Sequence, residues 1–217
     1  MSESITLHSH KGGPNPWKVV MVLEELGLKY NTIFVDANTG EHKKGPYTAL
    51  NPNGRMPTLV DHSNNDFTIW ESGAIVLYLI GKYDTTHKIS FPDFDSTAIA
   101  NQYLMFQMSG QGPYFGQAAW FMHFHSEKLP SAVERYVAEI HRILGVLDGI
   151  LADKEYLVGG KASYADLSFI PWNWAFGFFG EHVAGWEEKY PNFTAWNTRL
   201  NERAAVKKTK ADKAAVN

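Results

Sequence analysis

The sequence predicts an α/β unit followed by an all-helical unit, and three patterns along its 217 residues support this division. The first third alternates strand-like and helix-like segments in the order βαβ, then ββα. Residues 85–95 lie in a turn-rich stretch without periodicity, which is typical of a linker. Beyond this stretch, apolar residues recur at helical spacing. We therefore expect one domain over residues 1–84 and a second over residues 96–217.

The first domain is expected to contain four strands and two helices. The predicted strands are Ser4–Ser9, Lys29–Asp36, Thr58–Asp61 and Phe67–Trp70. The predicted helices are Pro16–Leu26, which stops before Gly27, and Ser72–Tyr83. The last two strands form a hairpin, and the polar stretch over residues 37–53 is expected to be irregular.

The second domain is expected to consist of helices. The predicted segments are Thr97–His125, Ser131–Leu151, Tyr164–Phe179 and Phe193–Arg203. Ser163, followed three residues later by Asp166 and then by an apolar run, predicts a capping box. The polar residues 204–217 are expected to form a frayed, solvated helix end.

Composition excludes several classes of function. The net charge of −3 provides no field to gather nucleic acid or an anionic membrane, and no apolar run is long enough to span a bilayer. Since the chain has no cysteine, any sulfur chemistry must use a sulfur brought by a ligand. His123 and His125 do not share a helix face and have no completing ligands nearby, so we expect no metal site. Together with the absence of a leader pattern, this composition predicts a cytoplasmic protein.

A binding groove is predicted where a proline precedes a strand and a Glu-Ser pair precedes an apolar helix. Pro57 should expose the backbone groups of Met56, which could then pair with a peptide-like ligand as an added strand does. Ser72 is placed as a helix N-cap with Glu71 beside it, and both residues could serve only to start that helix. In a binding role, Glu71 would meet an amine while Ser72 and the helix N–H groups meet a carboxylate. A γ-glutamyl peptide satisfies these demands.

The loop before the first helix could hold the sulfur of such a ligand. Asn15 is predicted as the N-cap and Pro16 as the first helical residue. A helix start favours a negative charge such as a thiolate, and the Asn15 amide can donate to the ligand while capping its helix. Ser9, at the end of the first strand, could donate to the same sulfur or bond only to local backbone.

The stretch GEHKKGPY provides basic groups for the far end of the groove. His42, Lys43 and Lys44 lie there, and Arg55 is near in sequence. They form either a solvated basic loop or a site for a second carboxylate, at the C-terminal end of the peptide.

In this order, these motifs resemble the cytosolic glutathione transferases. The matching strings are SHKGGPNPWKV, YNTIFVDANTGEHKKGPY, NPNGRMPTLVDH, IWESGAI, GPYFGQA and SAVERY. They are most similar to the subgroup that includes a yeast nitrogen-catabolite regulator and bacterial nu-class transferases, and they cover nearly the whole chain. The resemblance implies a thioredoxin-like N-terminal domain, a helical C-terminal domain and a homodimer with a second-substrate pocket against the C-terminal helices.

The resemblance also implies the cofactor and its contacts. Glutathione, reduced or oxidised, would be held by Glu71 and Ser72 at its γ-glutamyl end and by the Met56 backbone at its cysteinyl amide. His42, and more weakly Arg55, would approach the glycyl carboxylate. Asn15 would lie near the sulfur.

The implied activity is redox chemistry on a small thiol, disulfide, peroxide or electrophile. The tyrosine or cysteine that other classes place near the end of the first strand is missing from LHSHKGG, so conjugation is expected to be secondary to disulfide and peroxide reduction. Two alternatives remain at this point. One is a ligand carrier or regulator that binds glutathione with little turnover, and the other is a structural module in a larger assembly.

Overall fold

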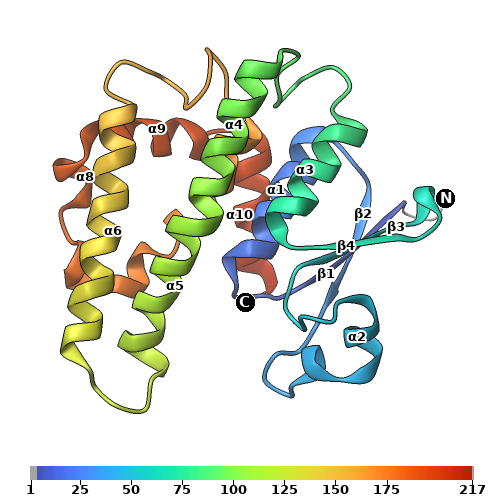
Figure 1. Ribbon diagram of the computed structural model, residues 1–217, viewed down its shortest axis with the longest axis horizontal. Coiled ribbons are helices and arrows are strands. Elements are labelled where there is room, and N and C mark those ends of the chain that lie inside the picture. Colours follow the sequence, from blue (N-terminus) through green and yellow to red (C-terminus); the bar gives the residue numbers. More distant parts are fainter. Residues whose placement is uncertain (1–3, 217) are drawn as a thin grey trace. The chain divides into compact units, whose positions relative to one another are not determined.

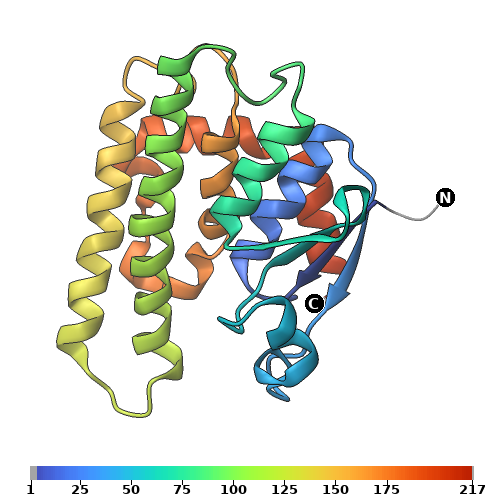
Figure 2. The same cartoon turned by 45° about the vertical axis from the view of Figure 1, so that its right-hand side comes forward.

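The computed structural model describes residues 4–216 and divides them into two compact units (Figures 1 and 2). The first unit comprises the residues up to Lys88 together with those from Ala204 onward, and the second runs from Ile89 to Arg203. The chain passes from the first unit to the second between Lys88 and Ile89 and returns to the first between Arg203 and Ala204. Within residues 4–216, no helix is both long enough and apolar enough to cross a membrane.

The first unit is built on a four-stranded mixed sheet. Its strands are β1 (Ile5–Ser9), β2 (Tyr30–Phe34), β3 (Thr58–Asp61) and β4 (Phe67–Trp70). Their order across the sheet is β2-β1-β3-β4, with β1 parallel to β2 and antiparallel to β3, and β3 antiparallel to β4. The helical elements are α1 (Pro14–Leu26), η1 (Glu41–Lys43), α2 (Gly45–Leu50), η2 (His62–Asn64), α3 (Ser72–Tyr83) and α10 (Ala204–Val216). This is the predicted thioredoxin-like arrangement.

The core of the first unit lies between the sheet and helices α1 and α3, which pack side by side (Figure 1). Strand β1 alternates, so that Ile5, Leu7 and Ser9 are fully buried while the residues between them are half-buried. Helix α3 buries Ile75 and Leu79. Each such aliphatic side chain stabilises the fold by about 1.5–3 kcal/mol.

The short helix α2 is a correction to the sequence analysis, which predicts an irregular stretch over residues 37–53. The helix begins at Gly45 with Pro46 in its first turn, where a missing N–H costs nothing. Its one buried side chain is Tyr47, whose hydroxyl bonds to Thr58 Oγ1 at 2.8 Å. Six residues are too few to show a hydrophobic period, so this helix depends on a contact with a distant strand.

The C-terminal helix is a second correction. The sequence predicts a frayed and solvated end, whereas α10 packs on α1 and buries Val206 and Thr209 completely. Lys208 Nζ also forms an ion pair with Glu24 Oε1 of α1 at 2.8 Å. The prediction is wrong because α10 has many charged residues and few large apolar ones, so its sequence gives little sign of a buried face. Only the packed structure shows which of its side chains contact α1.

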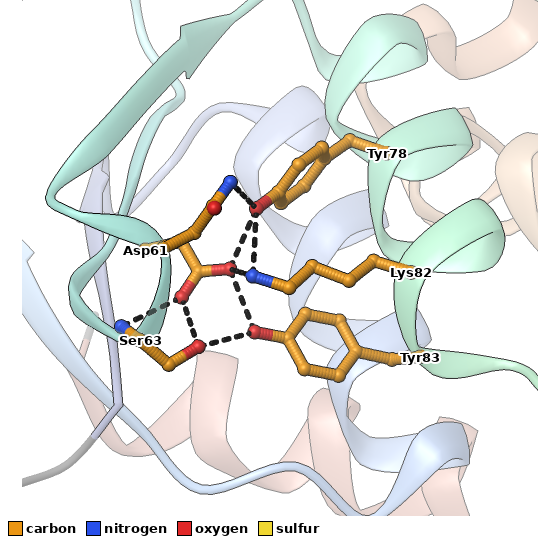
Figure 3. A network of polar contacts seen from close by, with 6 residues as sticks. Asp61, Ser63, Tyr78, Lys82 and Tyr83 are labelled. Carbon is orange, nitrogen blue, oxygen red and sulfur yellow. Dashed lines mark hydrogen bonds and ion pairs between the residues drawn. The ribbon is translucent and has the colours of Figure 1, made fainter.

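A buried carboxylate joins the end of β3 to α3 (Figure 3). Asp61 is fully buried, and its Oδ1 accepts hydrogen bonds from Ser63 N at 3.0 Å and Ser63 Oγ at 2.7 Å. Its Oδ2 accepts from Tyr78 OH at 2.6 Å, Lys82 Nζ at 2.7 Å and Tyr83 OH at 2.6 Å. Burial acts to raise the pKa of Asp61, but these hydrogen bonds outweigh it and lower the pKa well below its ordinary value. The network anchors the helix that begins at Ser72.

The second unit is helical, as predicted. Its elements are α4 (Phe94–Phe106), η3 (Gln107–Gln111), α5 (Gly112–Ala119), η4 (Trp120–Phe124), α6 (Pro130–Ile150), α7 (Tyr164–Asn173), η5 (Phe176–Val183), α8 (Trp186–Lys189) and α9 (Pro191–Asn201). The predicted helix 97–125 is a nearly continuous helical run with π-helical turns at η3 and η4. The predicted helix 164–179 is too long, since α7 ends at Asn173 and a 3₁₀ segment with a kink at Gly180 follows.

The predicted capping box organises the start of α7. Ser163 and Asp166 form its reciprocal bonds, and Asp166 is fully buried. The Asp166 carboxylate also accepts from Leu157 N and from Trp196 Nε1 of α9, each at 2.9 Å. The Asp166 side chain therefore caps the start of α7 and also connects α7 to α9.

Candidate functional site

The entrance to β3 is a fixed loop whose outer backbone is open to a ligand. The Met56–Pro57 peptide bond is cis. Tyr47 OH and Asn51 Nδ2 both donate to the carbonyl oxygen of Arg55, at 2.6 and 2.7 Å. Within residues 4–216, no group hydrogen-bonds to the Met56 backbone. An extended peptide could pair with that N–H and C=O.

The start of α3 lies beside this loop, and it differs from the prediction in one respect. Glu71, with φ +69°, occupies the N-cap position, and Ser72 is the first helical residue. Ser72 Oγ accepts a hydrogen bond from Lys18 Nζ at 3.1 Å. Asn53 Nδ2 makes a long contact of 3.5 Å with Glu71 Oε1. The Glu-Ser pair and the β3 entrance therefore belong to one locality.

The start of α1 is also displaced from the prediction. The helix begins at Pro14 with Gly13 as N-cap, so Asn15 is its second residue rather than its cap. Proline fixes φ near the helical value, which lets Pro14 start the helix before Asn15. Since prolines stand on both sides of Asn15 and have no N–H, Asn15 is the only backbone N–H donor among the first three helical residues. Asn15 and Lys18 are three residues apart and share a helix face.

Ser9 lies inside the first unit. Its side chain is fully buried, and its hydroxyl has no hydrogen-bond partner among the described residues. A ligand sulfur could accept from this hydroxyl only if it entered the interior. Its role at the sulfur stays a prediction.

The basic loop is tied to the β3 entrance. Lys43 Nζ donates to the carbonyl oxygen of Asn53 at 3.0 Å. Gly54 has φ +59°, and a Cβ there would lie 2.7 Å from the carbonyl oxygen of His42, so this approach requires glycine. His42 Nδ1 is buried without a partner among residues 4–216, and the Arg55 side chain is exposed. Both residues therefore flank the loop that carries Met56.

Lys18 is a site residue that the sequence analysis did not single out. Its side chain is fully buried, and burial lowers its pKa to about 7 against the opposing field of Glu71. A lone lysine in the apolar run WKVVMVL is a signal that could have found it. Its contact with Ser72 could not be read from the sequence, because 54 positions separate the two residues.

Histidines near the start of α1 are held neutral. Burial is the largest cause of the lowered pKa of His10, and repulsion from His42 and Lys213 lowers that pKa further. Its Nδ1 accepts from Gly13 N at 2.9 Å, so the ring orders the loop. Burial likewise lowers the pKa of His8, whose ring lies edge-on to Tyr47. Both shifts favour the neutral form of the His8 and His10 rings at pH 7.

The two units each contain a cavity near residues of interest. In the first, a cavity of about 500 Å³ lies between the loop before α1 and the end of β2, where it is lined by His10, Lys11, Phe34 and Asp36. In the second, a mainly apolar cavity of about 600 Å³ is lined by residues of η4, η5 and the start of α6. Both are large enough for a small organic molecule. No cluster of three or more metal-ligating side chains occurs within the described chain.

Comparisons with known families match both units. Residues 3–81 match the family model "Glutathione S-transferase, N-terminal domain", and residues 112–204 match "Glutathione S-transferase, C-terminal domain". Glutathione S-transferase 2 of Schizosaccharomyces pombe is 55% identical over 216 residues, with 94% of each chain covered. The transcriptional regulator URE2 of Saccharomyces cerevisiae is 38% identical, with 94% of this chain and 67% of that protein covered.

Solved structures agree with these matches. The glutathione transferase URE2P6 of Phanerochaete chrysosporium, solved in complex with oxidized glutathione, superposes with a TM-score of 0.96 at 52% identity and covers 100% of this chain and 99% of that one. Ure2p in complex with glutathione superposes with a TM-score of 0.90 at 40% identity, with 95% and 94% covered. A further relative, Ure2p5 of Phanerochaete chrysosporium, was cocrystallized with 1-(S-glutathionyl)-2,4-dinitrobenzene.

Proposed function

Because this chain belongs to the glutathione S-transferase family, we propose that it binds glutathione in the first unit and uses the glutathione thiolate mainly to reduce disulfides and peroxides. Conjugation of electrophiles is a secondary activity in this proposal. The observation that carries the binding step is the open Met56 backbone in one locality with Glu71 and Ser72. Relatives solved with glutathione, oxidized glutathione and a glutathione conjugate support it.

Each part of glutathione has an assigned partner in this proposal. The γ-glutamyl amine meets Glu71, and its carboxylate meets Ser72 and the N–H groups at the start of α3. The cysteinyl amide pairs with the Met56 backbone as an added strand would. The glycyl carboxylate lies toward His42 and Arg55 on the tied basic loop.

Asn15 supplies the stabilisation of the sulfur. Because the chain has no cysteine, the reacting sulfur is that of glutathione. A free thiol has a pKa near 8.5, and lowering it by about 2, or roughly 2.7 kcal/mol, raises the thiolate fraction at pH 7 about twenty-five-fold. The Asn15 amide and its backbone N–H, between two prolines at the α1 start, are suited to that task. Ser9 is a weaker candidate because it is buried.

The reaction consumes two glutathione molecules. The first thiolate attacks one sulfur of the substrate disulfide, which forms a mixed disulfide and releases a substrate thiolate that takes up a proton. A second glutathione thiolate attacks the glutathione sulfur of the mixed disulfide, which yields oxidised glutathione and the second substrate thiol. With a peroxide, two glutathione thiols are oxidised to the same disulfide while the peroxide is reduced to an alcohol and water.

The same proposal extends to assembly and location. We expect a cytoplasmic homodimer, as the sequence resemblance implies. Light scattering coupled to size exclusion tests the oligomeric state, and a mass near 24.4 kDa, that of one chain, would contradict it.

Reduction of a small mixed disulfide by glutathione tests the activity. Wild type is compared with Asn15→Ala at matched glutathione saturation, with Asn31→Ala on the exposed face of β2 as control. We expect turnover by wild type and Asn31→Ala and a loss of at least about tenfold, or 1.4 kcal/mol, in Asn15→Ala. Glutathione binding without turnover in wild type would contradict the proposed chemistry and favour a carrier or regulator.

A further inference from the structure

The loop between β1 and α1 is closed by a histidine that has no part in the proposed reaction so far. His10 directly follows β1, and its Nδ1 accepts a hydrogen bond from Gly13 N at 2.9 Å. This is the one hydrogen bond of the ring within residues 4–216. Since Gly13 is the N-cap of α1, the imidazole connects the end of a strand to the start of the helix that carries Asn15.

We propose that His10 is a positioning residue for the glutathione sulfur: its ring holds Gly13 and thereby sets where Asn15 lies. The inference rests on the proposed function above. His10 acts through Asn15, because its Nδ1 bonds to the loop itself.

The composition of the loop makes the position of Asn15 depend on this bond. The four residues between His10 and Asn15 include Gly12 and Gly13, which have the greatest conformational freedom of any residue type. Pro14 follows them with its φ fixed by its ring. The hydrogen bond from Gly13 to His10 closes the chain across both glycines, so it restrains the flexible part of the connection and leaves the rigid part to carry Asn15.

The imidazole ring also packs on the loop that it closes. A Cβ at Gly13 would lie 3.3 Å from His10 Nδ1, and a Cβ at Gly12 would lie 3.5 Å from His10 Cε1. The first distance is shorter than ordinary van der Waals contact, so an alanine at position 13 would displace the ring. Gly13 has φ −72°, which any residue adopts. The contact with His10, and not the backbone conformation, therefore explains a glycine at this position.

The ring must be neutral to make its bond to Gly13. An imidazolium donates from both nitrogens, so only the neutral ring with its proton on Nε2 accepts at Nδ1. Burial is the largest cause that lowers the pKa of His10, His42 and Lys213 lower it further, and Asp36 opposes them. At pH 7 the accepting form of the ring therefore predominates.

A second hydrogen bond holds the other side of the loop. Trp17 Nε1 donates to the carbonyl oxygen of Lys11 at 2.7 Å, and the Trp17 side chain is buried in the first unit. This bond ties the loop to the body of α1 and does not involve His10. We therefore expect that replacing His10 shifts the start of α1 without unfolding it.

A double-mutant cycle on the reduction of a small mixed disulfide at saturating glutathione tests the inference. His10→Phe keeps a ring but cannot accept a hydrogen bond, and we expect its kcat at pH 7.5 to fall about fivefold. Asn15→Ala should fall at least about tenfold, as above. If His10 acts through Asn15, the double variant should be at most about twofold slower than Asn15→Ala, whereas independent effects would multiply to about fiftyfold. The KM for glutathione should stay within about twofold of wild type in His10→Phe, because Met56, Glu71 and Ser72 are unchanged.

Rescue and control variants separate positioning from general damage. An asparagine oxygen can accept from a backbone N–H three positions later, so we expect His10→Asn to keep kcat within about twofold of wild type. His62→Phe is the matched control, since it also removes an imidazole that is hydrogen-bonded in the first unit, to Thr6 Oγ1 at 2.9 Å and Asp66 Oδ1 at 2.6 Å. We expect it to keep the wild-type kcat. Circular dichroism checks that each variant is folded, and if His10→Phe is not, Gly13→Ala takes its place in the cycle because its Cβ displaces the same ring.

The outcomes are distinguishable. The inference is wrong and the proposed function stands if His10→Phe keeps the wild-type kcat, if the double variant shows the fiftyfold loss, or if His10→Asn is as slow as His10→Phe. If wild type binds glutathione without turnover, or if Asn15→Ala is as fast as wild type, the proposed role of the sulfur site fails and the inference fails with it.

Discussion

Replacing Asp61 by asparagine should remove the charge that anchors α3 to the sheet. The carboxylate accepts five hydrogen bonds, three of them at Oδ2, and an amide cannot accept at both ends. A hydrogen bond to a charged group contributes about 1.5–3 kcal/mol. Some of this loss is recovered because the Lys82 side chain is 30% exposed and can return to water. We therefore expect Asp61→Asn to destabilise the protein by about 3–5 kcal/mol.

Thermal and urea unfolding followed by circular dichroism at pH 7 measure this effect. For a chain of this size, the expected loss corresponds to a fall in Tm of about 6–20 °C. Asp66→Asn is the matched control, since its side chain lies in the same hairpin, is 75% exposed and, among residues 4–216, hydrogen-bonds only to His62. We expect that control to change stability by less than about 1 kcal/mol. Equal effects of the two substitutions would refute the reasoning.

The difference in unfolding free energy between wild type and Asp61→Asn should also depend on pH, which provides a second check. The pKa of Asp61 is lower in the folded protein than in the unfolded chain, so its contribution is complete above pH 4 and is lost as the pH falls toward the folded value. The stability gap between wild type and Asp61→Asn should be constant from pH 6 to pH 8 and should narrow below about pH 4. A gap that stays constant down to pH 3 would contradict this assignment.

Three further predictions concern the site and the second unit. Glu71→Gln should raise the glutathione KM at least about tenfold without changing Tm, because it removes the charge that meets the ligand amine; an unchanged KM excludes that role. Gly54→Ala should lower the free energy of unfolding in urea by about 1–3 kcal/mol, since its Cβ would lie 2.7 Å from the His42 carbonyl oxygen at φ +59°. An unchanged free energy of unfolding would show that the loop can move to accommodate the Cβ. Asp166→Ala should lower the free energy of unfolding by about 3–5 kcal/mol in the same assay, because the capping box and the Trp196 N–H lose their acceptor. Trp196→Phe removes only one of these hydrogen bonds and should lower it less. A larger loss in Trp196→Phe than in Asp166→Ala would contradict the proposed role of Asp166.

Local sequence determined much of this protein. Strand alternation and helical spacing placed β1, β3, β4, α3 and α6 to within one or two residues. The capping box of Ser163 and Asp166 was readable because it needs only two residues three positions apart. The strand-entrance proline and the Glu-Ser pair were also visible, since each depends on its immediate neighbours.

Only the tertiary structure decided how distant residues meet. It placed Lys18 under Ser72, Asp61 among the side chains of α3, and α10 against α1. It also moved the cap of α1 to Gly13 and left the Ser72 hydroxyl bonded to a lysine rather than capping its own helix. The physical reason is that burial and hydrogen-bond partners are set by three-dimensional packing, whereas propensity and periodicity report only on a residue's neighbours in sequence.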